Sequence, residues 1–144
     1  MGIWLFVHLL AAGTWLGCVL VEIAFERALA VRGQWTLLAR LHDSVDRWIE
    51  LPALAVVVVT GWWLLRAGFA EIDLSGWLQA KIAFGLLAVL ANLYCALLVS
   101  RRHRLAESND LDAVKHIDQL QHKVGVLVLV GLLGAIACGL VAAN

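Results

Sequence analysis

The stretch WLQAKIAFGLLAVLANLYCALLV, residues 77–99, decides the fold class, because it is long and apolar enough to cross a lipid bilayer as a helix. Three further apolar stretches lie at residues 3–21, 51–65 and 124–142. Of the 144 residues, 62% are hydrophobic, more than one small globule can bury. We therefore predict an all-α integral membrane protein, with residues 1–144 forming a single four-helix domain folded as an antiparallel bundle.

The bundle is expected to extend beyond the membrane on one side. Residues 35–50 repeat apolar side chains at helical spacing and lead directly into the second stretch, with Pro52 where a kink is tolerated. Turn signals separate the long helices at residues 32–34 and 108–110. The segments between the first and second stretches, and between the third and fourth, are thus predicted to be helical extensions.

Basic residues predict the topology. Nine of them lie in the two segments just described, and the central loop has only Arg66. The positive-inside rule then predicts a multi-pass protein of the cell (inner) membrane, with both termini outside the cytoplasm. The expected outer interface carries a belt of aromatic residues: Trp4, Trp62, Trp63 and Trp77.

Composition also limits the partners. The formal net charge is zero and no basic patch is interleaved with aromatic residues, so the lipid bilayer is an expected partner and nucleic acid is not. Cys18, Cys95 and Cys138 are far apart in apolar stretches, which argues against a disulfide framework. Two sets of small residues, Gly13 with Gly17 and Gly131 with Ala135 and Gly139, fit close helix contacts within one chain or in a homodimer, and this choice stays open.

Two ionisable residues lie deep inside apolar stretches, His8 and Lys81. Such groups are functional candidates because lipid makes them costly. Each follows a belt tryptophan by a few residues, so the two could face each other across the outer half of the bundle. The alternative is that His8 bonds a backbone carbonyl and that Lys81 extends to the interface.

Acidic and imidazole side chains gather at the opposite end. They form three pairs with i, i+4 spacing: Glu22 with Glu26, Asp46 with Glu50, and Asp118 with His122. His42, His103 and His116 are near enough to contribute. Carboxylates and histidines from several helices are how bundles build di-iron or di-manganese sites.

We expect these residues to form two metal-binding layers, the first of Glu22, Glu50 and His122, the second of Glu26, Asp46 and Asp118. The alternative is a solvated rim in which basic residues neutralise the acids, namely Arg27, Arg47 and Lys123.

The order of several motifs resembles a known family. His8, Trp15 and Gly17 in the first stretch, LPAL at 51–54 with GWWLL at 61–65, and WLQAK at 77–81 look like the bacterial four-helix membrane protoporphyrinogen oxidase (HemJ type) and its copper-resistance D relatives. The resemblance implies haem b, oxidation of protoporphyrinogen to protoporphyrin, and functional roles for His8 and Lys81.

The chain departs from this family in its inner half. It has EIAFER at residues 22–27, NLY at 92–94 and HIDQLQHK at 116–123, where the family has a proline with basic and aromatic residues, a Tyr-His pair and an Asn-Glu signature with proline. The chain is therefore interpreted as a divergent member.

Two functional hypotheses follow. In the first, the protein is a membrane oxidoreductase: His8 binds haem iron, Lys81 is catalytic and pairs with a haem propionate or an anionic substrate such as a porphyrin, and electrons pass to quinone or another membrane acceptor. In the second, the carboxylate and histidine cluster holds a non-haem metal, namely iron, manganese, zinc or copper. The single deep histidine favours the second. A third reading is an assembly factor without a cofactor.

Overall fold

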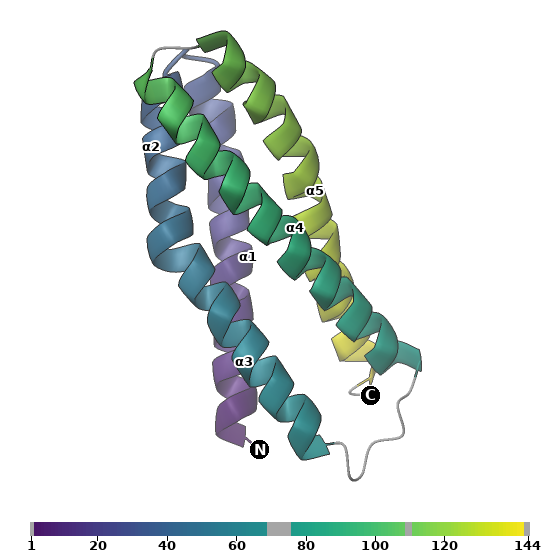
Figure 1. The fold of residues 1–144 in the computed structure, drawn as a ribbon. Coiled ribbons are helices and arrows are strands. Elements are labelled where there is room, and N and C mark those ends of the chain that lie inside the picture. The colour runs from purple at the N-terminus through teal and green to yellow at the C-terminus, as the bar shows by residue number, and fades with distance from the viewer. Residues whose placement is uncertain (1, 69–75, 109–110, 143–144) are drawn as a thin grey trace.

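The protein folds as an all-α antiparallel four-helix bundle, as predicted (Figure 1). The computed structural model describes residues 2–68, 76–108 and 111–142. Its elements in chain order are α1 (Gly2–Ala30), α2 (Trp35–Val45), the π-helical turn η1 (Asp46–Glu50), α3 (Leu51–Gly68), α4 (Gly76–Glu107) and α5 (Leu111–Ala142). Since α2, η1 and α3 follow one another without a break, they form one long helix.

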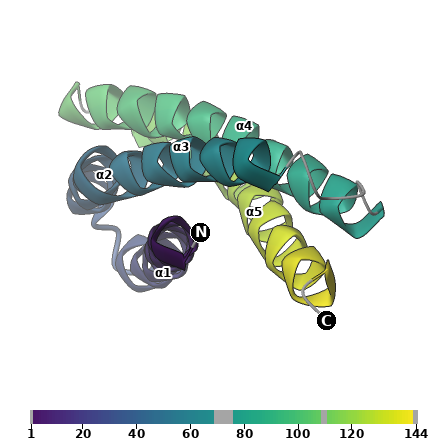
Figure 2. The same ribbon diagram turned by 90° about the horizontal axis from the view of Figure 1, so that it is seen from below.

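Both termini lie at one end of the bundle, which we call the terminal end (Figure 1). The opposite end, where α1 leads into α2 and where α4 ends beside the start of α5, is the turn end. Helix α1 packs mainly on α3, and α4 packs on α5 along most of its length. At the terminal end α5 points away from α1, so the two helix pairs diverge there (Figure 2).

In the described part of the chain, four helices are long and apolar enough to cross a membrane: Gly2–Ala30, Trp35–Ala67, Gly76–Glu107 and Asp112–Val141. Each coincides with one of the predicted apolar stretches over all or nearly all of that stretch's length. The four belt tryptophans lie on the parts of α1, α3 and α4 at the terminal end, and the rings of Trp4 and Trp63 are 5.5 Å apart between centroids. These features are those of a multi-pass membrane protein.

The turn between α1 and α2 depends on the backbone conformation of Gly33. Gly33 has φ of 68°, a left-handed conformation that glycine adopts without steric cost. The amides of Gly33 and Gln34 donate to the carbonyls of Ala30 and Leu29, at 3.0 Å each, and so close the end of α1. The first predicted turn is confirmed, whereas Asn109 and Asp110 of the second lie outside the described residues.

The long second helix changes its winding at η1. The amide of Leu51 donates to the carbonyl of Asp46, five residues back, which is the π-helical pattern. Pro52 follows immediately and has no amide hydrogen to donate to the carbonyl four residues earlier. The wider turn therefore lies where proline interrupts the α-helical hydrogen bonds, close to the predicted kink.

Small residues bring α4 and α5 together. A methyl group added at Gly131 would lie 2.8 Å from the Ala88 Cβ, so only glycine allows this approach. A methyl group at Gly13 or Gly17 would meet nothing within 4 Å among the described residues. The predicted close packing is thus found at Gly131 and not at the α1 pair.

Apolar clusters lie on either side of a polar layer. The larger one joins all the long helices through Trp15, Val19, Ala53, Leu54, Ala88, Val128 and Leu132. A smaller one, at the turn end, contains Ala39, Ala106 and Val114. The polar side chains between them are enclosed by packed apolar groups, in the half of the bundle toward the turn end.

Candidate metal centre

The polar layer contains side chains of kinds that are seldom buried. Its members are each at least nine-tenths buried: Glu22, His42, Asp46, Glu50, Asn92, Arg102 and Gln121. They come from α1, α2, η1, α4 and α5, so the site exists only when the whole bundle is assembled. Buried charges need partners or a bound ion, because removing them from water is costly.

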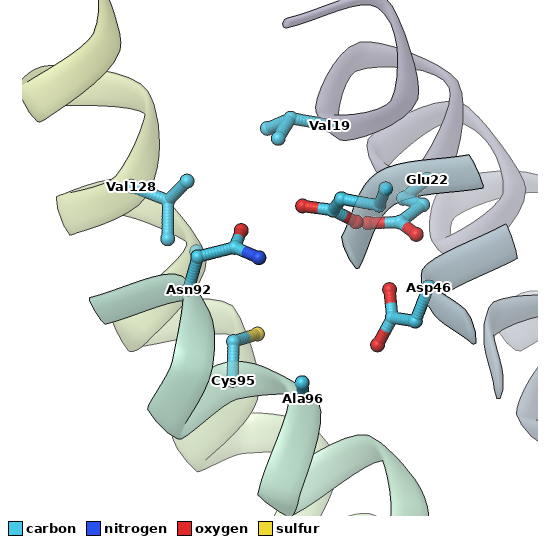
Figure 3. Close-up of a pocket in the computed structure, with 9 residues that line it drawn as sticks. Val19, Glu22, Asp46, Asn92, Cys95, Ala96 and Val128 are labelled. Carbon is cyan, nitrogen blue, oxygen red and sulfur yellow. The ribbon is translucent and has the colours of Figure 1, made fainter. Parts of the chain in front are cut away.

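Three carboxylates line a small cavity. Glu22 reaches it from α1, and Asp46 and Glu50 reach it from η1, while Asn92 and Cys95 of α4 close the other side (Figure 3). The cavity has a volume of about 30 Å³, room for about one water molecule or one ion. The π-helical turn matters here because it presents both of its acidic residues to the same space.

Neighbouring side chains hold two of the carboxylates in place. The indole N–H of Trp15 donates to Glu50 Oε1 at 3.0 Å and to Asn92 Oδ1 at 3.1 Å. His42 Nε2 lies 3.0 Å from Glu22 Oε2. The other oxygen of this carboxylate, Oε1, is buried and has no hydrogen-bond partner among the described residues. Glu22 thus keeps one oxygen available to a ligand.

The protonation of His42 follows from its partners. The Arg102 guanidinium can only donate, and its NH2 group lies 2.8 Å from His42 Nδ1. Nδ1 therefore accepts, and the neutral ring carries its hydrogen on Nε2, directed at Glu22. Ligand atoms of Glu22, His42 and Asp46 lie within 4.8 Å of one another, close enough to share a metal ion. With this tautomer, His42 donates to Glu22 and orients it, and neither ring nitrogen has a lone pair left for a metal ion.

Arg102, the arginine of this layer, pairs with acids other than the three that line the cavity. Arg102 NH1 donates to Asp118 Oδ1 and lies 3.7 Å from Glu26 Oε1. Within the described residues, Glu22, Asp46 and Glu50 form no ion pair with a lysine or an arginine. Carboxylates that share a site repel each other, whereas a divalent cation between them makes the same crowding favourable.

The predicted site residues are thus divided into two groups. Glu22, Asp46 and Glu50 surround one cavity, and His122 Nδ1 lies 3.3 Å from Glu26 Oε2. The predicted grouping in layers is wrong, because His122 lies on an exposed face of α5 and η1 brings Asp46 alongside Glu50. Of the additional histidines, His116 is exposed, and His103 pairs with Glu107 of its own helix at 3.5 Å.

The expected neutralised rim also differs from the structure. Arg47 pairs with Asp43 on the surface at 3.2 Å, and Arg27 and Lys123 are exposed. Among the described residues the buried cation is instead Arg102, one of the nine basic residues from which the topology was predicted. Its position could have been found, because it continues the buried face of α4: Ala88, Asn92, Val99, Arg102 and Ala106 recur at helical spacing.

The outer pair lies toward the terminal end. His8 Nδ1 is 2.9 Å from the hydroxyl of Thr60, and the His8 ring packs against Gly61 of α3. Lys81 lies against Gly139 of α5, where an added methyl group would be 3.3 Å from its Nζ. Each side chain therefore contacts a neighbouring helix.

No protein-family model, curated protein or solved structure matches this chain. The chemistry of the site is therefore argued from its geometry.

Proposed function

We propose that the protein is a membrane-embedded metal protein that binds one divalent transition-metal ion between Glu22, Asp46 and Glu50. The observation that carries this proposal is the ion-sized cavity between three buried carboxylates that have no lysine or arginine partner among the described residues. Glu22 Oε1, which has no hydrogen-bond partner in the same part of the chain, supports it independently. With Arg102 already paired to Asp118 and Glu26, a dication supplies the missing positive charge.

The ligand atoms favour particular metals. Carboxylate oxygens, with the Asn92 amide oxygen nearby, are hard donors that suit Mn²⁺ or Fe²⁺ better than copper. Hydrogen bonds from Trp15 and His42 to ligating carboxylates are the outer contacts that tune such centres. Since manganese and iron change oxidation state, the proposal includes a role in membrane oxidoreduction.

The proposed centre lies toward the cytoplasm. The nine basic residues of the two helical extensions lie in the turn-end half of the bundle, and the four belt tryptophans lie at the other end. This distribution supports an inner-membrane orientation with both termini outside the cytoplasm.

Two neighbouring acids provide a matched test. Asp46 lines the cavity, whereas Asp43 lies outside it and pairs with the exposed Arg47. Added Mn²⁺ should raise the melting temperature of the wild-type protein and of Asp43→Asn, because the ion binds only the folded chain. Asp46→Asn should lose this increase. Equal responses of the two variants, or no response in the wild type, would refute the carboxylate site.

A second candidate function is haem binding at His8, and one local geometry favours it. The Thr60 hydroxyl gives its hydrogen to the Val56 carbonyl at 2.6 Å, so its oxygen must accept from His8 Nδ1. The lone pair of His8 is then on Nε2, as an iron ligand requires. This tautomer suits His8 as an iron ligand, and bound haem would supply one-electron chemistry.

In this reading Lys81, the other deep ionisable group, would pair with a propionate or with an anionic substrate. His8→Ala should abolish the Soret band of protein supplied with haem, and Lys81→Ala should keep it while lowering activity. Wild-type protein without a Soret band after haem is supplied would end this reading, with no consequence for the carboxylate site.

A further inference from the structure

A second, larger cavity adjoins the carboxylate cavity. Its volume is about 190 Å³, and it contains the contact between Glu26 and His122. The two cavities share Val19, Glu22, Cys95 and Gly125 as lining residues. Glu22 therefore lies at the junction, with one oxygen at His42 and the other without a partner.

The larger cavity connects this junction with the surface. The side chain of His122 is 60% exposed, whereas that of Glu26 is only 14% exposed. Gln121, which also lines the cavity, is almost fully buried, and its Oε1 has no hydrogen-bond partner among the described residues. An imidazole, a carboxylate and an amide oxygen thus follow one another inward, and all can bind a cation. The Glu26 oxygen on this route is Oε2, which faces His122, whereas Oε1 lies 3.7 Å from Arg102.

From this arrangement we propose that the larger cavity is the entry route of the divalent ion, with His122 and Glu26 as its first ligands and Glu22 as the group that passes it to Asp46 and Glu50. The inference rests on the proposed metal site and adds its route of loading. Arg27 also lines the cavity and is exposed, so its positive charge opposes the approach of a cation.

Gly125 makes the route testable. A methyl group added there would meet no atom within 4 Å among the described residues, so a larger side chain would occupy the junction without a clash at its base. Gly13, where an added methyl group is equally free of contacts, provides a matched control on an exposed face.

The experiment measures the rate of Mn²⁺ uptake by purified full-length protein, mixed in a stopped-flow instrument with a fluorescent indicator of the free ion. Gly125→Leu should slow uptake about tenfold or more at unchanged final stoichiometry, and Gly13→Leu should have the wild-type rate. Glu26→Gln should also slow uptake, and Arg27→Gln should accelerate it, because the two changes alter the charge along the route in opposite directions.

The outcomes separate the two proposals. If the wild-type protein takes up Mn²⁺ and the Gly125→Leu variant takes it up at the same rate, the proposed entry route is overturned and the proposed metal site is not affected. Insensitivity of the rate to both Glu26→Gln and Arg27→Gln would also overturn it. Wild-type protein that takes up no Mn²⁺ would overturn the metal site, and the route with it.

Discussion

The indole N–H of Trp15 joins α1 to η1 and to α4, and it holds one of the cavity carboxylates, Glu50. The indole is 1% exposed and lies in α1, and its N–H is shared by Glu50 of η1 and Asn92 of α4. Such outer contacts fix the direction of a metal ligand. The conservative change Trp15→Phe retains most of the apolar volume and removes only this donor.

We therefore expect Trp15→Phe to weaken Mn²⁺ binding by about 10–100-fold, as loss of an outer hydrogen bond to a metal ligand commonly does. Titration calorimetry in detergent measures the effect. Trp48, whose side chain is 77% exposed, provides the control, and Trp48→Phe should leave the affinity unchanged. Equal affinities of wild type and Trp15→Phe would show that the indole does not position Glu50.

Arg102 has a different role, because it stabilises the fold. It contacts Asp118, Glu26 and His42 while almost fully buried. Arg102→Gln would leave two acids without their cation, and breaking a buried pair in this way costs about 3–5 kcal/mol. Chemical unfolding should show this loss, whereas the exposed neighbour Arg101, changed to Gln, should alter stability little. Similar losses for both variants would contradict the assigned role.

At the residue scale the sequence predicts which side chains gather better than how they pair. Glu22, Asp46 and Glu50 are among the six residues predicted to gather at this end, but Asp46 was expected in the other layer. The pairing of Arg102 with Asp118 depends on how α4 and α5 are rotated against each other, which the positions of single charges do not specify. His42 was expected only as an additional ligand, and its orienting role depends on the tautomer that Arg102 imposes.

At the scale of helices, the π-helical turn is the feature that sequence patterns miss. Helical periodicity predicted a continuous helix through residues 35–65, and the structure confirms it. The winding of η1 depends on whether its amides donate to carbonyls four residues back, as in an α-helix, or five residues back, as in a π-helix. Pro52 indicates where the α-helical pattern is interrupted, but the apolar pattern does not indicate that a π-helical turn replaces it.

The contact of α4 with α5 gives a prediction for the helix pair. Gly131→Ala places a methyl group 2.8 Å from Ala88 Cβ and 2.9 Å from the Phe84 carbonyl oxygen, so the helices must separate. We expect a destabilisation of about 1–3 kcal/mol, typical of an overpacked contact. Gly13→Ala should be neutral or stabilising, since alanine favours helix and no atom is near. Unfolding in mixed detergents measures both, and the reverse order would refute this packing.

At the scale of the whole molecule, composition and length were sufficient for the fold class. Apolar stretches of bilayer length leave a helical bundle as the simplest solution, and the Trp4 and Trp63 contact agrees with antiparallel order. The divergence of the helix pairs at the terminal end could not be predicted, because the angle at which helices cross depends on how their side chains pack and not on composition or length.

Orientation in the membrane is the corresponding prediction. Cysteine introduced at Gln34, in the turn between α1 and α2, should react with a membrane-impermeant maleimide only after the cells are opened. Cysteine at Asp73, which lies outside the described residues between α3 and α4, should react in intact cells. The opposite labelling pattern would place the carboxylate centre on the outer side and contradict the positive-inside assignment.

The metal content of the protein tests the central claim most directly. Protein purified without chelators, loaded with Mn²⁺ or with Fe²⁺ under anaerobic conditions and freed of excess ion, should contain about one metal ion per chain by elemental analysis. Asp46→Asn should contain almost none, and Asp43→Asn, which changes an acid outside the cavity, should match the wild type. A folded wild-type protein that retains neither metal would show that the buried carboxylates of Glu22, Asp46 and Glu50 do not form a metal site.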